Sequence, residues 1–319
     1  MRFAALRFDL FARHLAASKR PILVGPWRAE VGFEALYWLP FLTWFRDRYH
    51  IDPTRLIAWS RGGASAWYGM GQSLELYGQM SPDEIRVLTL QAAARTGSTK
   101  QMAVEPWERA LVALVGAQSG TRPLWLHPAW MYRLLAPFWM DRAAPTLMDR
   151  YTKVAVLKPP PVPPNLQLPP SYVAVRFYAR PTWQPNEEQM GWMRGLVERL
   201  AKKQPVVLLN SGHRLDDHAD LMVADPAKNI HSLDAILTPR NNLGVLSAVL
   251  GRAAGFVGTY GGLAQLGLRM GVPSISCYTH WGGTAAAHLT LSQRLSLAMG
   301  VPFHVCRPQE AEHWAGLLG

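Results

Sequence analysis

Residues 256–278, FVGTYGGLAQLGLRMGVPSISCY, form the stretch that most constrains how this chain can fold. It begins with an apolar run, continues through a glycine-bearing turn at 258–262, and then carries apolar residues at helical spacing. Gly271 and Pro273 follow at the positions where a helix commonly ends, and 274–278 has the composition of a second strand. The stretch therefore predicts a strand, a turn, a helix and a parallel strand.

The turn of this unit is a candidate anion site. The first N–H groups of a helix have no partner within the helix, and the helix dipole favours negative charge beside them. Glycine lets the backbone approach a ligand closely and adopt a positive φ. We expect a phosphate to be held by Thr259, Tyr260, Gly261 and Gly262. The alternative is a plain crossover whose glycines serve only the turn.

Apolar runs alternate with helical patterns along the whole chain. Strands are expected at 21–25, 55–60, 172–177, 205–210 and near Ile230, and helices at 33–48, 186–203 and 241–252. Alternation of this kind predicts an α/β fold with parallel sheets covered by helices on both faces.

The run KPPPVPPNLQLPPS at 158–171 is the clearest domain boundary. Repeated prolines cannot occupy a central strand or a helix interior, and they favour stiff extended chain. We therefore expect two domains, an N-terminal one at 1–157 and a C-terminal one at 172–319, joined by a linker at 158–171. A chain of 319 residues is long enough for two domains of ordinary size.

Composition narrows the choice of partners. The net charge of +11 suits an anionic partner, but no aromatic–basic RNA signature or helix-turn-helix pattern is present, so nucleic acid is not expected. The two cysteines, Cys277 and Cys306, lie in apolar runs and suggest buried thiols in a reducing cytoplasm.

Two segments raise the question of membrane contact, although no run reaches the ~20 apolar residues that span a bilayer. Phe3, Leu6 and Leu10 recur at helical spacing among arginines, which predicts an amphipathic helix on a membrane surface or on the protein's own flank. The aromatic and basic run at 122–142 predicts either a buried helix pair broken by prolines or an acceptor or membrane-interface surface.

The sequence from 237 to 278 resembles the nucleotide-sugar-binding half of GT-B glycosyltransferases, and GVPS at 271–274 resembles the GxP of many of them. The resemblance is good over the C-terminal half of the chain and weak over the N-terminal half. It implies two Rossmann-like domains facing across a cleft, with 1–157 as the N-terminal acceptor domain and 172–319 as the C-terminal nucleotide-sugar-binding domain. It also implies a donor diphosphate held by amides and basic side chains, without a metal ion or other cofactor.

Further donor contacts are expected at the carboxyl ends of neighbouring strands, because these ends share one edge of an open sheet. The candidates are Arg176 and Arg180 after the first strand of the second half, and Ser211, Gly212 and His213 after the next. The alternative is a pair of surface arginines and a structural turn.

An acidic cluster nearby invites a metal-binding interpretation. Asp216, Asp217, His218 and Asp220 are nevertheless interpreted as a solvated helix start, because adjacent residues cannot all converge on one ion.

The segment 25–32, GPWRAEVG, resembles the loop after the first strand of heptosyltransferase-like enzymes, where an acid follows the glycine. The resemblance implies that Glu30 accepts the proton of the acceptor hydroxyl, with the acceptor near Gly32 and Arg61. The alternative is that Glu30 only occupies a first helical turn, where acids are favoured.

These observations predict a metal-independent glycosyltransferase that moves a sugar from a nucleotide diphosphate donor to a hydroxyl of a glycan or lipid-linked acceptor. It would act in the cytoplasm, with peripheral membrane contact as an option. Two alternatives stay open: a nucleotide-sugar epimerase of the same architecture, and a non-catalytic nucleotide- or glycan-binding protein.

Overall fold

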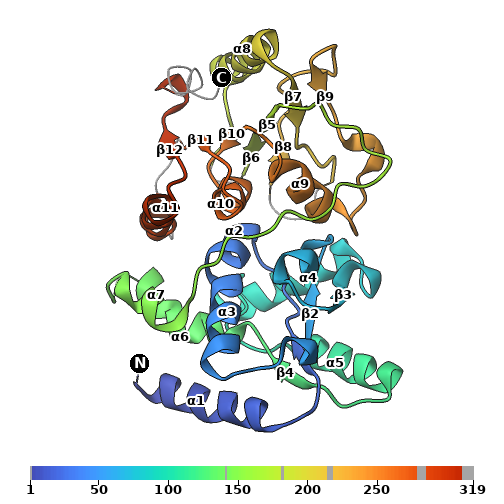
Figure 1. Ribbon diagram of the computed structural model, residues 1–319, viewed down its shortest axis with the longest axis vertical. Coiled ribbons are helices and arrows are strands. Elements are labelled where there is room, and N and C mark those ends of the chain that lie inside the picture. Colours follow the sequence, from blue (N-terminus) through green and yellow to red (C-terminus); the bar gives the residue numbers. More distant parts are fainter. Residues whose placement is uncertain (1, 141, 181–182, 214–217, 279–284, 311–319) are drawn as a thin grey trace. The chain divides into compact units, whose positions relative to one another are not determined.

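The computed structural model describes residues 2–140, 142–180, 183–213, 218–278 and 285–310 (Figure 1). The chain divides into two compact units, unit 1 (Met1–Ala155) and unit 2 (Val156–Gly319). Each unit has its own parallel sheet with helices packed against it, so the predicted α/β fold is confirmed. None of the described helices is long and apolar enough to cross a bilayer.

In its described residues, unit 1 contains a four-stranded parallel sheet in the order β3–β2–β1–β4. The strands are β1 (Ile22–Val24), β2 (Leu56–Ser60), β3 (Gln72–Glu75) and β4 (Leu124–Leu126). The helices are α1 (Arg2–Ala17), α2 (Val31–Phe33), α3 (Leu39–Arg48), α4 (Pro82–Thr96), α5 (Pro106–Ser119), α6 (Ala129–Trp139) and α7 (Thr146–Tyr151), with short 3₁₀ turns at Pro53–Arg55, Ala64–Tyr68 and Leu76–Gly78. Strand β1 lies in the middle and is fully buried.

The helix predicted after β1 is present but is not a regular α-helix. A π-helical segment, Glu34–Trp38, joins α2 to α3, and the N–H of Leu39 donates to the carbonyl of Glu34. Pro40 has no N–H to donate to the preceding turn, so the helical ladder is already interrupted at this point. Such π-helical segments are frequent at functional sites.

The prediction of a broken helix pair at 122–142 was wrong. Residues 124–126 form β4, which pairs with β1, and only α6 follows. Pro137 lies inside α6, whose buried face includes Tyr132 and Phe138. Local pattern could not reveal β4, because a strand of three residues is defined by the neighbour with which it pairs.

In its described residues, unit 2 contains a six-stranded parallel sheet in the order β12–β11–β10–β5–β7–β9 and a small antiparallel pair, β6–β8. The strands are β5 (Val173–Arg176), β6 (Tyr178–Ala179), β7 (Val206–Leu208), β8 (Ala219–Asp220), β9 (Ile230–His231), β10 (Gly255–Thr259), β11 (Ser274–Cys277) and β12 (Phe303–Cys306). The helices are α8 (Glu187–Lys203), α9 (Asn242–Leu250), α10 (Gly262–Arg269) and α11 (Ala285–Met299), with 3₁₀ turns at Asp234–Ile236 and Pro308–Glu310.

Residues 256–278 therefore fold as predicted, as β10, α10 and β11. Gly271 ends the helix with φ 83°, a left-handed conformation that favours glycine. Strand β10 lies between β5 and β11, with Gly258 opposite Arg176 on one side and Ser276 on the other. The carboxyl ends of these three strands consequently lie at one edge of the sheet.

The proline-rich run has no helix or strand. Just before it, the Leu157 N–H donates to the Arg269 carbonyl (2.8 Å), and within it the Pro160 carbonyl accepts from the Arg252 guanidinium (2.7 Å). The beginning of the run is thus held against the helices of unit 2.

Candidate functional site

The N-terminus of α10 lies at the end of β10 in unit 2. The first hydrogen bond of the helix runs from the Gln265 N–H to the Gly261 carbonyl (3.1 Å), and no side chain of the described residues caps the helix. The N–H groups of residues 262–264 therefore have no intrahelical acceptor, and the helix dipole gives this end partial positive charge. The arrangement suits a phosphate or another anion.

Gly261 is required here for its lack of a side chain rather than for an unusual backbone conformation. Its φ of 168° is extended backbone, which any residue can adopt. A Cβ at this position would overlap the hydroxyl of Tyr178, which donates to the Tyr260 carbonyl (3.2 Å). The Tyr178 side chain therefore lies directly against the turn that precedes α10.

The side chains of Thr259 and Tyr260 are already engaged within the protein. The Thr259 hydroxyl accepts from the Tyr178 N–H (3.1 Å), and its side chain is buried. The Tyr260 hydroxyl accepts from the Gln265 amide (3.4 Å), and burial raises its pKa to about 12. At this turn the backbone, more than these two hydroxyls, is available to a ligand.

Arg180 brings a cation to the same edge of the sheet. Its guanidinium lies 4.6 Å from the centroid of the Tyr278 ring, and that ring contacts the Tyr260 ring at 5.4 Å. The Nε atom of Arg180 is buried and has no hydrogen-bond partner among the described residues. A buried N–H without an acceptor is unfavourable. An anion at this position would accept a hydrogen bond from the Arg180 Nε–H and balance the charge of the guanidinium.

Arg176, the other predicted arginine, is paired within the protein. Its Nε donates to Asp220 Oδ1 (2.7 Å), and the second carboxylate oxygen accepts from the N–H (2.6 Å) and hydroxyl (3.0 Å) of Ser211. Asp220 thus joins the ends of β5 and β7 to β8. Arg176 and Ser211 lie at the predicted edge, where they support the site through Asp220.

The remaining predicted residues of this edge form a turn after β7. Gly212 has a left-handed φ of 63°, and His213 Nε2 lies 3.3 Å from the Leu237 carbonyl. The predicted helix start in the following acidic cluster is wrong where it can be examined, because Asp220 belongs to strand β8. Asp216 and Asp217 lie outside the described residues.

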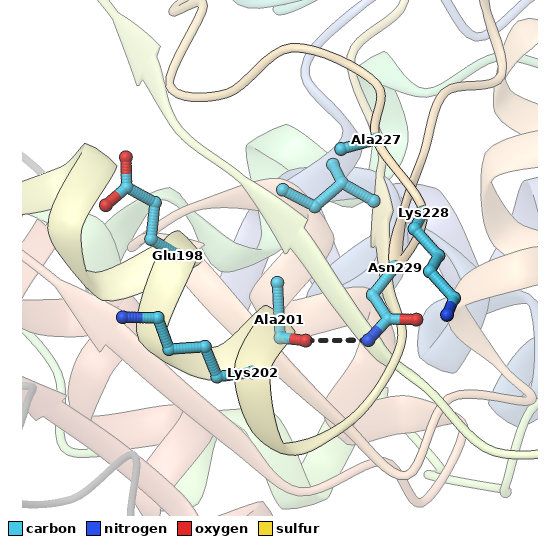
Figure 2. A pocket seen from close by; sticks show the side chains of 7 residues that line it. Glu198, Ala201, Lys202, Ala227, Lys228 and Asn229 are labelled. Atoms are coloured by element: carbon cyan, nitrogen blue, oxygen red, sulfur yellow. Dashed lines mark hydrogen bonds between the residues drawn. The ribbon is translucent and has the colours of Figure 1, made fainter.

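A shallow depression of about 310 Å³ also occurs in unit 2 (Figure 2). It is lined by Glu198, Ala201, Lys202, Ala227, Lys228, Asn229 and Ile230. It lies between the last turn of α8 and the start of β9, at the amino edge of the sheet. Ligands of open α/β sheets bind beyond the carboxyl ends of the strands, and in Figure 2 the two lysine ammonium groups point apart. The depression is therefore not the candidate site.

In unit 1 the loop after β1 carries the predicted base. Glu30 immediately precedes α2, its side chain is about half exposed, and it pairs with the Lys100 ammonium (2.5 Å). That ammonium also lies 3.9 Å from the centroid of the Phe33 ring. Glu30 therefore combines solvent access with a fixed position, both of which a general base needs. Gly32, predicted to lie near the acceptor, is buried in α2.

Arg61, the other predicted acceptor contact, is buried in an ion pair. Its guanidinium donates to Glu34 Oε2 (2.8 Å), and Glu34 Oε1 accepts from the hydroxyls of Ser60 (2.7 Å) and Tyr68 (2.6 Å). Burial raises the pKa of the Glu34 carboxyl. Arg61 also donates to the Ala29 carbonyl, so this group stabilises the loop that carries Glu30.

A second buried network fixes the same loop, and sequence reasoning missed it. The Glu108 carboxylate contacts the Arg28 guanidinium (3.2 Å), the Gln101 amide (3.1 Å) and His127 Nε2 (3.1 Å). Burial opposes ionisation of Glu108, but the hydrogen bond and charge of His127 and the charge of Arg28 lower its pKa. Gln101 also donates to the Pro26 carbonyl (2.9 Å). No local signal joins residues 80 positions apart.

Within the described ranges, no three His, Cys, Asp or Glu side chains are grouped so that they could hold a metal ion.

Comparison with known proteins finds similarity to solved structures. No protein-family model and no curated protein sequence matches the chain. A glycosyl transferase family 9 protein from Veillonella parvula DSM 2008 has 11% identity and a TM-score of 0.49, over 94% of this chain and 97% of that one. The E. coli heptosyltransferase WaaC with ADP has 14% identity and a TM-score of 0.44, over 94% of this chain and 100% of that one.

A protein from Listeria monocytogenes assigned as a UDP-N-acetylglucosamine 2-epimerase has 11% identity and a TM-score of 0.42, over 94% of this chain and 88% of that one. Glycosyltransferases, including heptosyltransferases, are among the solved structures that are similar to this chain.

Proposed function

We propose that the chain is a glycosyltransferase that moves a sugar from a nucleotide diphosphate donor to an acceptor hydroxyl without a metal ion. The observation that supports this most is Arg180. Its buried Nε has no partner among the described residues, and its guanidinium lies against Tyr278 at the edge of the sheet where α10 begins. A fixed cation beside free helix N–H groups is suited to a diphosphate.

The proposed reaction uses these groups as follows. The bond between the anomeric carbon and the diphosphate oxygen breaks, and a bond forms from that carbon to the acceptor oxygen. The hydroxyl proton passes to Glu30, and the leaving diphosphate gains charge that Arg180 and the amides of α10 stabilise. Glu30 is chosen over Glu34 because its side chain is half exposed, whereas that of Glu34 is fully buried.

The acceptor in this proposal is a glycan or lipid-linked hydroxyl, and the compartment is the cytoplasm. The alternatives differ in what they consume. An epimerase would convert the donor without an acceptor, whereas a binding protein would hold the nucleotide and convert nothing.

Donor binding can be tested by calorimetry with UDP, GDP, ADP and dTDP, each measured without and with EDTA. We expect one of these diphosphates to bind, and Arg180→Met to weaken that binding about tenfold to hundredfold, because a charge-assisted hydrogen bond contributes ~1.5–3 kcal/mol. Arg194→Met on α8 is the matched control, since the Arg194 side chain is 49% exposed.

Equal affinity of wild type and a folded Arg180→Met protein would mean that the diphosphate site lies elsewhere. Loss of binding on addition of EDTA would contradict metal independence.

A further inference from the structure

Helix α1 has two apolar faces, of which only one is used inside unit 1. Phe8, Ala12 and Leu15 are buried on the inner face. The Phe8 ring packs against Phe41 of α3 (centroids 5.4 Å apart) and Trp130 of α6 (5.5 Å). The sequence left open whether this helix packs on the protein's own flank, and these ring contacts show that its inner face does so. Figure 1 shows α1 running along unit 1.

The outer face of α1 presents large apolar side chains to solvent. Phe3 is 71% exposed, Leu6 58% and Leu10 61%. Their spacing of three and four residues places them in one stripe of the helix. Three large exposed apolar side chains in one stripe form a surface that water does not favour, which is typical of an interaction site.

The same face is basic. Arg7 and Arg13 are exposed on it, and the Arg7 guanidinium lies 5.5 Å from the centroid of the Phe3 ring. Residues 2–20 contain five lysines and arginines and one acid, Asp9. That acid is already bound by Arg13 (2.8 Å) and by the Tyr49 hydroxyl (3.0 Å), so the excess charge of the segment is positive.

We propose that the outer face of α1 docks on an anionic lipid surface, with Phe3, Leu6 and Leu10 inserted among the acyl chains and the arginines at the headgroups. Arginine next to large apolar residues on a surface helix suits the boundary between headgroups and acyl chains. A second copy of this chain is a poorer occupant, because it would bring the same arginines face to face. This inference does not depend on the proposed transferase activity.

The test is co-sedimentation of the full chain with vesicles of two compositions. We expect binding to equal parts of phosphatidylglycerol and phosphatidylcholine, little binding to phosphatidylcholine alone, and weaker binding in about 0.5 M salt. The triple variant Phe3→Ser, Leu6→Ser, Leu10→Ser should lower the partition coefficient at least ~10-fold, because the apolar area that enters the bilayer is lost.

A matched triple variant controls for the general loss of exposed apolar surface. Val87→Ser, Leu90→Ser and Leu297→Ser remove side chains that are 46%, 54% and 85% exposed on α4 and α11. This control should bind vesicles like the wild type, and circular dichroism should show both variants folded.

Three results would overturn the proposal. One is equal vesicle binding by the α1 variant and the wild type, and another is absence of binding by the wild type. The third is a concentration-dependent dimer that is lost in the α1 variant while lipid binding is absent, which would assign the face to a second copy.

Discussion

Two glutamates four positions apart in the chain have opposite environments. Glu34 is fully buried and accepts hydrogen bonds from Ser60, Arg61 and Tyr68. Its carboxylate is therefore not accessible to the hydroxyl of a sugar-accepting substrate. Glu30 is half exposed and is held by Lys100 alone among the ion pairs of the described residues. At the scale of single residues, exposure therefore decides which acid can exchange a proton with a substrate.

Glu30→Gln should lower turnover by about 10²–10⁴-fold, the usual contribution of a general base. Donor affinity should change little, because Glu30 belongs to unit 1 and the proposed diphosphate site belongs to unit 2. Steady-state kinetics and calorimetry with the nucleotide that the wild type binds would measure the two quantities.

Glu187→Gln is the control, because Glu187 is likewise an exposed glutamate at the start of a helix. Wild-type turnover by Glu30→Gln would remove Glu30 from the proposed chemistry. An equal fall in turnover and in thermal stability would instead indicate a structural role.

At the scale of elements, the turn between β10 and α10 is shaped by β6. The Tyr178 hydroxyl fills the space in which a side chain at Gly261 would lie. Gly261→Ala should therefore destabilise the protein by ~1–3 kcal/mol and weaken diphosphate binding, because the added methyl group displaces either Tyr178 or the turn. Chemical denaturation and calorimetry would measure the two effects.

The double variant Tyr178→Phe, Gly261→Ala tests whether the overlap with the Tyr178 hydroxyl causes these effects. With the hydroxyl removed, the ring carbon at 3.2 Å becomes the nearest atom to the new Cβ, and most of the stability should return. Gly191→Ala on α8 is the control, since no atom lies within 4 Å of its Cβ position. Additive effects of the two changes would show that they do not share this space.

At the scale of the whole molecule, each unit has its own buried sheet, and the chain between them is exposed. The side chain of Lys153 is 62% exposed, and Val154 and Val156 are 38% and 63% exposed. We expect trypsin to cut first after Lys153, because short exposed segments are cleaved before helices and buried strands. Mass spectrometry should then find the fragments 1–153 and 154–319.

Lys153→Gln should slow this cleavage, while the next lysine, Lys158, is protected because Pro159 follows it. First cleavage at another position would mean that a different segment opens more readily.

The sequence alone was sufficient for the fold class and for most elements. Those features depend on local properties: the period of apolar residues and the glycine that ends α10. The edge at which the candidate site lies followed because parallel strands bring their carboxyl ends together.

The tertiary structure decided which of the candidate residues remain available to a ligand. Arg176 is taken by Asp220 and Arg61 by Glu34, whereas the Nε of Arg180 has no partner in the described part of the chain. These pairs join residues 27 to 44 positions apart. Such contacts arise only when separate strands and loops pack together, and no local pattern in the sequence records them.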